Sequence, residues 1–222
     1  MSNVSELLTA AEAAVVARVS VRDVNRVIDE SILPDDFVSL RGGRQVAAVG
    51  CPLIAFYFES AKRLTSEERL WAIRTAAPRL RDSPSLALLE ADWTFKDEFL
   101  TIDLAPFVRQ AHERLGRLEE ARTAVVSSND ILSGTPVFRG TRVPVHDVAA
   151  SLAAGVPIDR LLGAYPSLDA NRLELAKIYA EANPLRGRPR SSLDLPEGAK
   201  VITDRRLSRR RHEAPHRRML EP

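Results

Sequence analysis

Cysteine is almost absent from this chain, since Cys51 is the only one among 222 residues. A single thiol cannot close an internal disulfide or supply a multi-thiolate metal site, so no feature calls for an oxidising compartment. No stretch approaches the ~20 consecutive apolar residues that span a bilayer. Residues 1–8 also lack the charged head and apolar run of a signal peptide. These absences predict a cytoplasmic protein that is neither exported nor embedded in a membrane.

Patterns of catalytic and cofactor-binding residues are also scarce. The run His212 to His216 matches the His-Glu-x-x-His pattern of zinc peptidases, but Pro215 interrupts the helix that this pattern needs and no third ligand is evident. Residues 134–141 have a glycine at each end but lack the lysine of a phosphate-binding loop. No Ser/His/Asp or Cys/His arrangement can be argued from the order of residues. The sequence therefore predicts a protein that is not an enzyme and needs no cofactor.

Charge is distributed unevenly along the chain. The formal net charge is +2, yet residues 183–222 carry 11 Lys/Arg against 5 Asp/Glu, and residues 1–182 carry 21 against 25. A basic tail is typical of a segment that binds a polyanion or an acidic pocket on a partner, although many such tails only keep a protein soluble. Hydrophobic periodicity is lost after Pro184, which predicts a tail that orders only on binding.

The composition, with 45% apolar and 28% charged residues, is that of a globular chain with one large or two small domains. Hydrophobic periodicity predicts a mainly α fold with small β elements. We expect an N-terminal winged helix-turn-helix-like and scaffold domain at 1–125, a C-terminal three-helix domain at 126–183, and a basic tail at 184–222. The helices of the second domain are expected at 145–154, 157–164 and 169–182.

Two short helical patterns occupy residues 8–30, and each opens with a start signal. Thr9 with Glu12, and Ser20 with Asp23, have the spacing of a capping box, which satisfies free N–H groups in the first helical turn. In the second helix, apolar and polar positions fall on different faces. The apolar face is expected to consist of Val21, Val24, Val27 and Ile28, and the solvent-facing stripe of Arg22, Asn25, Arg26 and Asp29.

A glycine-turned ribbon follows these two helices. Pro34 ends the helical unit, and short strands are expected at 37–40 and 45–49 around the turn at 41–44. This is the order of elements in a winged helix-turn-helix, which places its second helix in the major groove of DNA and its wing on the backbone. The alternative is an ordinary helical hairpin with a solvated polar face.

The polar stripe of the second helix has the residue types that read bases, since Arg pairs with guanine edges and Asn with adenine edges. The predicted base contacts are Arg22, Asn25 and Arg26. Other arginines in the turn and wing would hold phosphates and fix the register without reading sequence. These predicted phosphate contacts are Arg18, Arg41 and Arg44.

The middle of the chain, residues 52–125, is the least informative part. It contains an apolar run at 52–58, a capped helix from Thr65, a short strand at 99–104 and a helix at 106–122. We interpret this part as a scaffold or a dimer interface.

A motif rich in glycine and proline precedes the last three helices. Residues 134–145 read Gly-Thr-Pro-Val-Phe-Arg-Gly-Thr-Arg-Val-Pro-Val. With residues 152–157 and 161–166 and the helix after Asp169, this run resembles the small domain of VapB-type antitoxins, which are paired with PIN-domain toxins, over about 55 residues. The resemblance implies a three-helix DNA-binding fold, a preceding strand segment that helps it to dimerise, and genetic coupling to a toxin ribonuclease.

In this C-terminal domain, the predicted phosphate contacts are Arg139, Arg142 and Arg172. The outward positions of its third helix are expected to be Asn171, Glu174, Lys177 and Glu181. Two of these four are carboxylates, which phosphates would repel. Two interpretations therefore stay open: the domain contacts DNA, or it mainly dimerises and leaves DNA to residues 9–49.

The basic tail has a role in the family that the chain resembles. In VapB-type antitoxins the tail crosses the toxin and places basic or apolar side chains at its acidic, metal-binding active site. An arginine fork makes strong charge-assisted hydrogen bonds to clustered carboxylates. The corresponding candidates here are Val201, Ile202, Arg205, Arg206, Leu207, Arg209, Arg210 and Arg211. The alternative is nonspecific attraction of nucleic acid by a solvated tail.

Together these features predict the antitoxin of a type II toxin–antitoxin system. We expect a homodimer that binds operator DNA, represses its own operon and neutralises a PIN-type ribonuclease. Its symmetry would impose a near-palindromic operator with half-sites about 10 base pairs or a multiple apart. Two alternatives remain: a transcription regulator without a toxin, whose middle segment binds a small ligand or a protein, and an interaction scaffold without a DNA role.

Overall fold

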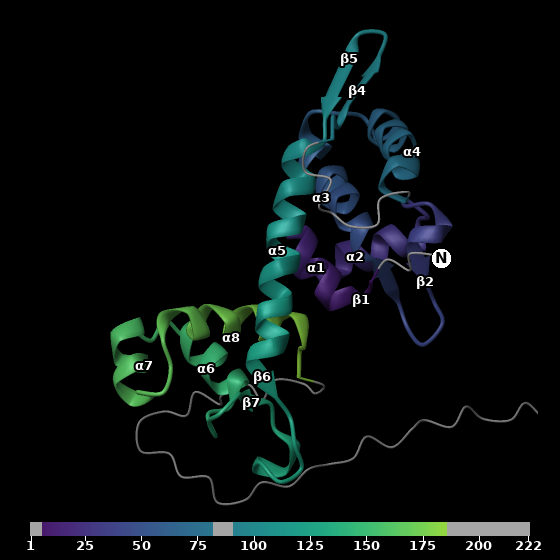
Figure 1. Ribbon diagram of the computed structural model, residues 1–222. Coiled ribbons are helices and arrows are strands. Elements are labelled where there is room, and N and C mark those ends of the chain that lie inside the picture. Colours follow the sequence, from purple (N-terminus) through teal and green to yellow (C-terminus); the bar gives the residue numbers. More distant parts are fainter. Residues whose placement is uncertain (1–5, 82–90, 186–222) are drawn as a thin grey trace, which may run out of the picture. The chain divides into compact units, whose positions relative to one another are not determined.

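The computed structural model describes residues 6–81 and 91–185. Within these ranges the chain has eight α-helices and seven short strands, which confirms the predicted mainly α fold with small β elements (Figure 1). The helices are α1 (Ala10–Ala17), α2 (Val21–Asp29), α3 (Cys51–Glu59), α4 (Ser66–Arg81), α5 (Ala105–Ala124), α6 (Val145–Ala153), α7 (Ile158–Ala164) and α8 (Ala170–Ala182). The strands are β1 (Leu7–Thr9), β2 (Val38–Ser39), β3 (Gln45–Ala47), β4 (Thr94–Asp97), β5 (Leu100–Asp103), β6 (Val125–Val126) and β7 (Val137–Phe138).

Local capping determines where three of the helices begin. Thr9 Oγ1 accepts a hydrogen bond from the N–H of Glu12 at 3.3 Å, and the Glu12 carboxylate accepts one from the N–H of Thr9 at 2.8 Å. The same reciprocal pairing precedes α2 and α4. Each pair satisfies N–H groups that the first helical turn would otherwise leave free. The helix starts predicted at Thr9, Ser20 and Thr65 are confirmed.

The N-terminal sheet has three antiparallel strands in the order β1-β3-β2. β2 and β3 are the arms of the predicted ribbon, while β1 was not predicted. The arms are shorter than expected because Asp35–Phe37 and Ala48–Gly50 form 3₁₀ turns next to them. Gly42 and Gly43 have φ values of +91° and +130°. Only glycine adopts such values without strain, so the two residues allow the tight turn of the wing.

Helices α1 to α5 share one hydrophobic cluster, to which α2 contributes the fully buried Val24 and Val27. Val21, on the same predicted face, is 41% exposed. Side chains of a helix tilt toward its N-terminus, and Val21, the first residue of α2, therefore points beyond the core. Burial raises the pKa of the Cys51 thiol in this cluster to about 12, which leaves it protonated and unreactive at neutral pH.

A second, smaller cluster holds the C-terminal elements. Strands β6 and β7 pair antiparallel with Val125 opposite Phe138, and Val137 forms a bridge to Pro144. Helices α6, α7 and α8 begin and end within one residue of their predicted limits. The buried residues of this cluster are Val125, Phe138, Val145, Val148, Leu161, Leu168, Leu173 and Ala176.

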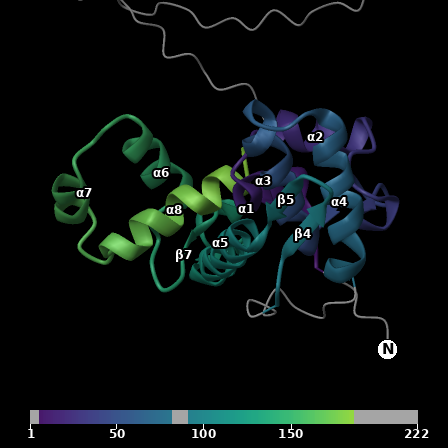
Figure 2. The ribbon, with the colours of Figure 1, turned by 90° about the horizontal axis from the view of Figure 1, so that it is seen from above.

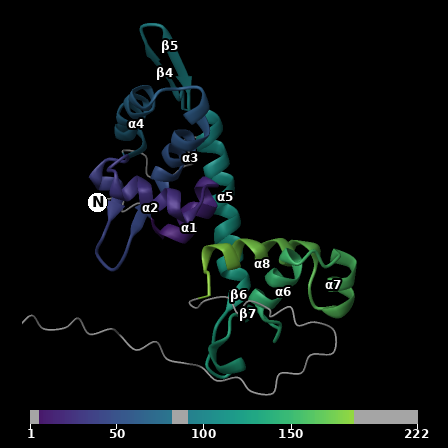
Figure 3. The same cartoon turned by 180° about the vertical axis from the view of Figure 1, so that it is seen from behind.

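Helix α8 joins the two clusters. Leu173 and Ala176 lie in the smaller cluster, and Ala182 lies in the larger one. Figures 2 and 3 show α8 beside α5 and α6, with which it makes extensive contacts. The residues up to Leu185 belong to one compact unit, and its division into two domains near residue 125 stays a prediction. In the described ranges, none of the helices has the length and apolar character needed to cross a bilayer.

Candidate nucleic-acid interface

The turn between α1 and α2 is closed by Arg18 in the left-handed conformation, with φ +56°. The N–H of Val19 donates to the carbonyl oxygen of Ala14 at 3.0 Å, and that of Arg18 to Val15 at 3.3 Å. This is a Schellman motif with arginine where glycine is usual. Left-handed backbone costs a non-glycine residue about 1–2 kcal/mol. Because the Arg18 side chain is exposed, the strain points to a use for its charge.

We expect Arg18→Gly to leave the free energy of unfolding unchanged or to raise it by up to about 1 kcal/mol. Glycine relieves the backbone strain but also gains freedom in the unfolded chain, and the two effects oppose each other. If the turn contacts DNA phosphates, the same substitution should also weaken DNA binding, because a positive charge is lost. Urea denaturation measures the first quantity, and fluorescence anisotropy of a labelled duplex measures the second. A loss of stability above about 1 kcal/mol would instead make the Arg18 side chain structural.

Arg114 of α5 lies against the same turn, and the sequence did not predict its role. Its Nη1 donates to the carbonyl oxygen of Val16 at 3.4 Å across 98 positions of the chain. Burial and the nearby charge of Arg18 lower the pKa of Arg114. No local pattern indicates this contact, because α5 is brought to α1 only by the packing of the larger cluster. Two positive charges thus lie together at the turn.

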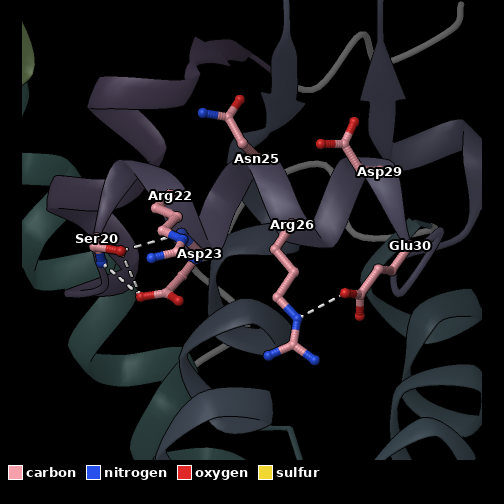
Figure 4. A pocket seen from close by; sticks show the side chains of 7 residues that line it. All are labelled: Ser20, Arg22, Asp23, Asn25, Arg26, Asp29 and Glu30. Atoms are coloured by element: carbon pink, nitrogen blue, oxygen red, sulfur yellow. Dashed lines mark hydrogen bonds and ion pairs between the residues drawn. The ribbon is translucent and has the colours of Figure 1, made fainter.

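The exposed face of α2 carries the three predicted base contacts. Figure 4 shows Asn25 and Asp29 pointing to one side of the helix, and Arg26 and Glu30 to another. Arg26 Nε donates to Glu30 Oε1 at 2.9 Å. Arg22 is exposed and forms no hydrogen bond or ion pair with any residue that the structure describes.

The wing is attached to this face through Arg44, which directly precedes β3. Arg44 Nη2 lies 2.8 Å from Asp29 Oδ1, and its Nη1 donates to Asn25 Oδ1 at 3.3 Å. The hydrogen bond and the charge of Asp29 raise the pKa of Arg44. Ion pairs this exposed contribute little to stability and can be exchanged for other anions. Arg41, in the wing turn, is exposed and has no polar partner among the described residues.

A surface depression of about 720 Å³ runs along this side of α2 (Figure 4). Pockets for small molecules are mostly apolar with a few polar groups. The residues that line the depression here all have polar or charged side chains, unlike such a pocket. The lining residues are Ser20, Arg22, Asp23, Asn25, Arg26, Asp29 and Glu30.

The three arginines predicted to hold phosphates in the C-terminal part differ in availability. Arg139 Nε donates to the carbonyl oxygen of Thr123 at 3.0 Å, near the end of α5. Arg172 Nη1 donates to the carbonyl oxygen of Ser167 at 3.1 Å. Arg142 is exposed and makes no hydrogen bond or ion pair within the described ranges. Arg139 and Arg172 therefore each bind a backbone carbonyl oxygen. Arg142 is the most available of the three to an external anion.

The outward positions predicted for the third C-terminal helix are all exposed on α8. Two of them accept hydrogen bonds from Arg117 of α5: Asn171 Oδ1 at 2.9 Å and Glu174 Oε2 at 3.0 Å. With α1, α5 and α6 packed against it, α8 is less open to a DNA groove than α2.

Two further predictions concern metals and the tail. Within residues 6–81 and 91–185, no group of three or more His, Cys, Asp and Glu side chains is placed to hold a metal ion. The eight residues predicted to bind a toxin, Val201, Ile202, Arg205, Arg206, Leu207, Arg209, Arg210 and Arg211, lie outside the described residues.

Comparison with known proteins defines the family of the chain. Residues 125–180, from β6 into α8, match the family described as a protein of unknown function, DUF433. The uncharacterized protein y4eO of Sinorhizobium fredii is 65% identical over 214 residues, which cover 95% of this chain and 97% of that protein. No solved structure shows a significant match. Because the similarity extends over nearly the full length of both sequences, the chain belongs to the same family as y4eO.

Proposed function

We propose that this protein is a sequence-specific DNA-binding regulator that uses residues 7–47 as a winged helix-turn-helix. The observation that carries the proposal is the contact of Arg44 with Asn25 and Asp29, since it puts the wing beside the polar face of α2. In a winged helix-turn-helix the second helix enters the major groove while the wing lies along the backbone. The cations at the turn and wing then meet phosphates, and the α2 face meets base edges.

Two observations favour this function over a helical hairpin with a merely solvated face. Arg18 occupies a strained backbone position that glycine would fill without steric strain, and its side chain is exposed. Arg22 projects from the first turn of α2 without an ion-pair partner among the described residues. Both features leave a cation exposed at the start of α2, where it is available to an external anion.

A mobility-shift series with the full chain and DNA from upstream of its own gene tests the proposal. Loss of Arg22 or Arg26 should relax base preference, whereas loss of Arg44 should weaken binding to all sequences alike. If these variants all behave as the parent, residues 7–47 are not part of a DNA interface.

We further propose that the regulator is the antitoxin of a type II toxin–antitoxin system, acting in the cytoplasm as a homodimer. Two features support this proposal: the resemblance of residues 134–182 to VapB-type antitoxins, and the 11 Lys/Arg in the last 40 residues. The tail would neutralise a PIN-type ribonuclease by placing arginines at its acidic active site.

Co-purification with the protein from the adjacent gene tests the antitoxin role. The full chain and a chain ending at Pro184 are each expressed with that protein, and ribonuclease activity is then measured. We expect only the full chain to bind and silence it. If neither chain binds, the function reduces to a DNA-binding regulator without a toxin.

A further inference from the structure

Asn25 is already engaged by the wing. Arginine carries five N–H donors and no acceptor, so Asn25 must turn its Oδ1 toward Arg44, as the 3.3 Å contact shows. Reading adenine takes both ends of the amide, because Oδ1 accepts from adenine N6 while Nδ2 donates to N7. Arg44 takes one of the two lone pairs of Oδ1, so pairing with adenine must compete with the contact that Asn25 makes to the wing.

Asp29 lies one helical turn further along α2 and is the second residue that contacts Arg44. Its Oδ1 lies 2.8 Å from Arg44 Nη2, while Asn25 takes Nη1. Two nitrogens of the guanidinium thus have contacts, and the two residues that make them lie on one side of α2 (Figure 4). A planar fork held at two points has a defined orientation, which a single contact would not give. Both residues thus act on the wing.

Arg22 and Arg26 differ in whether another side chain already pairs with them. Arg26 is paired with Glu30 at 2.9 Å. Arg22 has no such partner among the described residues and lies in the first turn of α2. The N-terminal residues of a recognition helix are those that contact base edges. Arg22 is thus the side chain most available for a bidentate pair with guanine O6 and N7.

We infer that Asn25 and Asp29 are positioning residues that hold the wing through Arg44, and that Arg22 reads sequence by pairing with guanine. This inference rests on the proposed function. Of the three predicted base contacts, it makes Arg22 the reader of guanine and Asn25 a support of the wing, and it leaves the predicted role of Arg26 unchanged. The ligand that it specifies is duplex DNA with a guanine at one position of each bound site.

Selection from random duplexes by the full chain provides a preferred duplex, which is then varied at each position. Arg22→Ala should weaken binding to the preferred duplex by about 5- to 150-fold and remove the preference for guanine at one position. Arg41→Ala removes the same charge from the wing turn and serves as the matched control. It should weaken all duplexes by one common factor.

Asn25→Ala should weaken all duplexes alike and should have no further effect in an Arg44→Ala chain, because Asn25 acts through Arg44. Loss of an adenine preference in Asn25→Ala would overturn the inference. So would an undiminished effect of Asn25→Ala in the absence of Arg44. Thermal melting of each variant checks that its fold is unchanged.

The outcomes separate the inference from the function on which it rests. If the parent chain selects no duplex and Arg41→Ala binds DNA no less well, the DNA-binding function fails. If the parent selects a duplex but its preference survives Arg22→Ala, the function stands and the inference fails.

Discussion

Raising the salt concentration from about 50 to 200 mM is expected to lower the affinity for DNA about 40-fold for one bound copy and about 2,000-fold for a dimer. The reason is counterion release: each cation that replaces condensed ions on the phosphates adds about −0.9 to the slope of log affinity against log salt. In the proposed interface, Arg18, Arg41 and Arg44 would provide three such cations in each copy.

Fluorescence anisotropy titrations at several salt concentrations measure this slope. Arg41→Ala should make it shallower by about one for each copy bound. The steepness for the parent also reports how many copies bind, because a dimer doubles the number of phosphates contacted. An affinity that hardly changes with salt would mean that the three arginines do not lie on phosphates.

Phe138→Ala is expected to lower the free energy of unfolding by about 3–5 kcal/mol, the usual cost of truncating a buried phenylalanine. Phe138 is fully buried in the smaller cluster. Its backbone also closes the turn of the motif, since its N–H donates to Val143 and its carbonyl oxygen accepts from Thr141. Because neighbouring side chains fill such a cavity only in part, local opening of residues 125–180 should accompany the loss.

Phe99→Ala is the matched control for this substitution. Phe99 lies between β4 and β5 and is fully exposed, at the end of a hairpin that projects beyond the neighbouring helices (Figures 1 and 3). Its loss should change the free energy of unfolding by less than about 0.5 kcal/mol. Urea denaturation compares the two variants, and hydrogen exchange locates the opening. Equal stabilities would contradict the assignment of Phe138 to the core.

The motif at residues 134–145 therefore combines two kinds of residue. Val137, Phe138 and Val145 are buried and hold the cluster together, while Arg139 and Arg142 are exposed. From the sequence alone, all of them belong to one run that resembles VapB-type antitoxins. Burial separates the residues that maintain the fold from those that can meet a partner.

Features that depend on neighbours in sequence could be predicted. Thr9 and Glu12 lie three positions apart, and this spacing alone brings the two groups of a capping box together in a first helical turn. The same holds for the limits of α6, α7 and α8, which glycines and prolines mark. The polar stripe of α2 also follows from helical geometry.

Features that depend on distant segments could not be predicted. Strand β1 pairs with β3, although about 40 residues separate them. Arg122 reaches Glu12 across 110 positions and so ties the first capping box to α5. Arg117 reaches Glu174 in the same way, from α5 to α8. No periodicity indicates which partners such long side chains find.

The sequence by itself determined the helix starts, the mainly α class and the set of arginines and asparagine available on α2, because each of these rests on spacing within a few residues. Only the tertiary structure decided that Arg44 contacts Asn25 and Asp29, while Arg22 has no partner among the described residues. That difference arises because the antiparallel ribbon brings Arg44 beside α2, and contacts between separate elements depend on how the whole core packs.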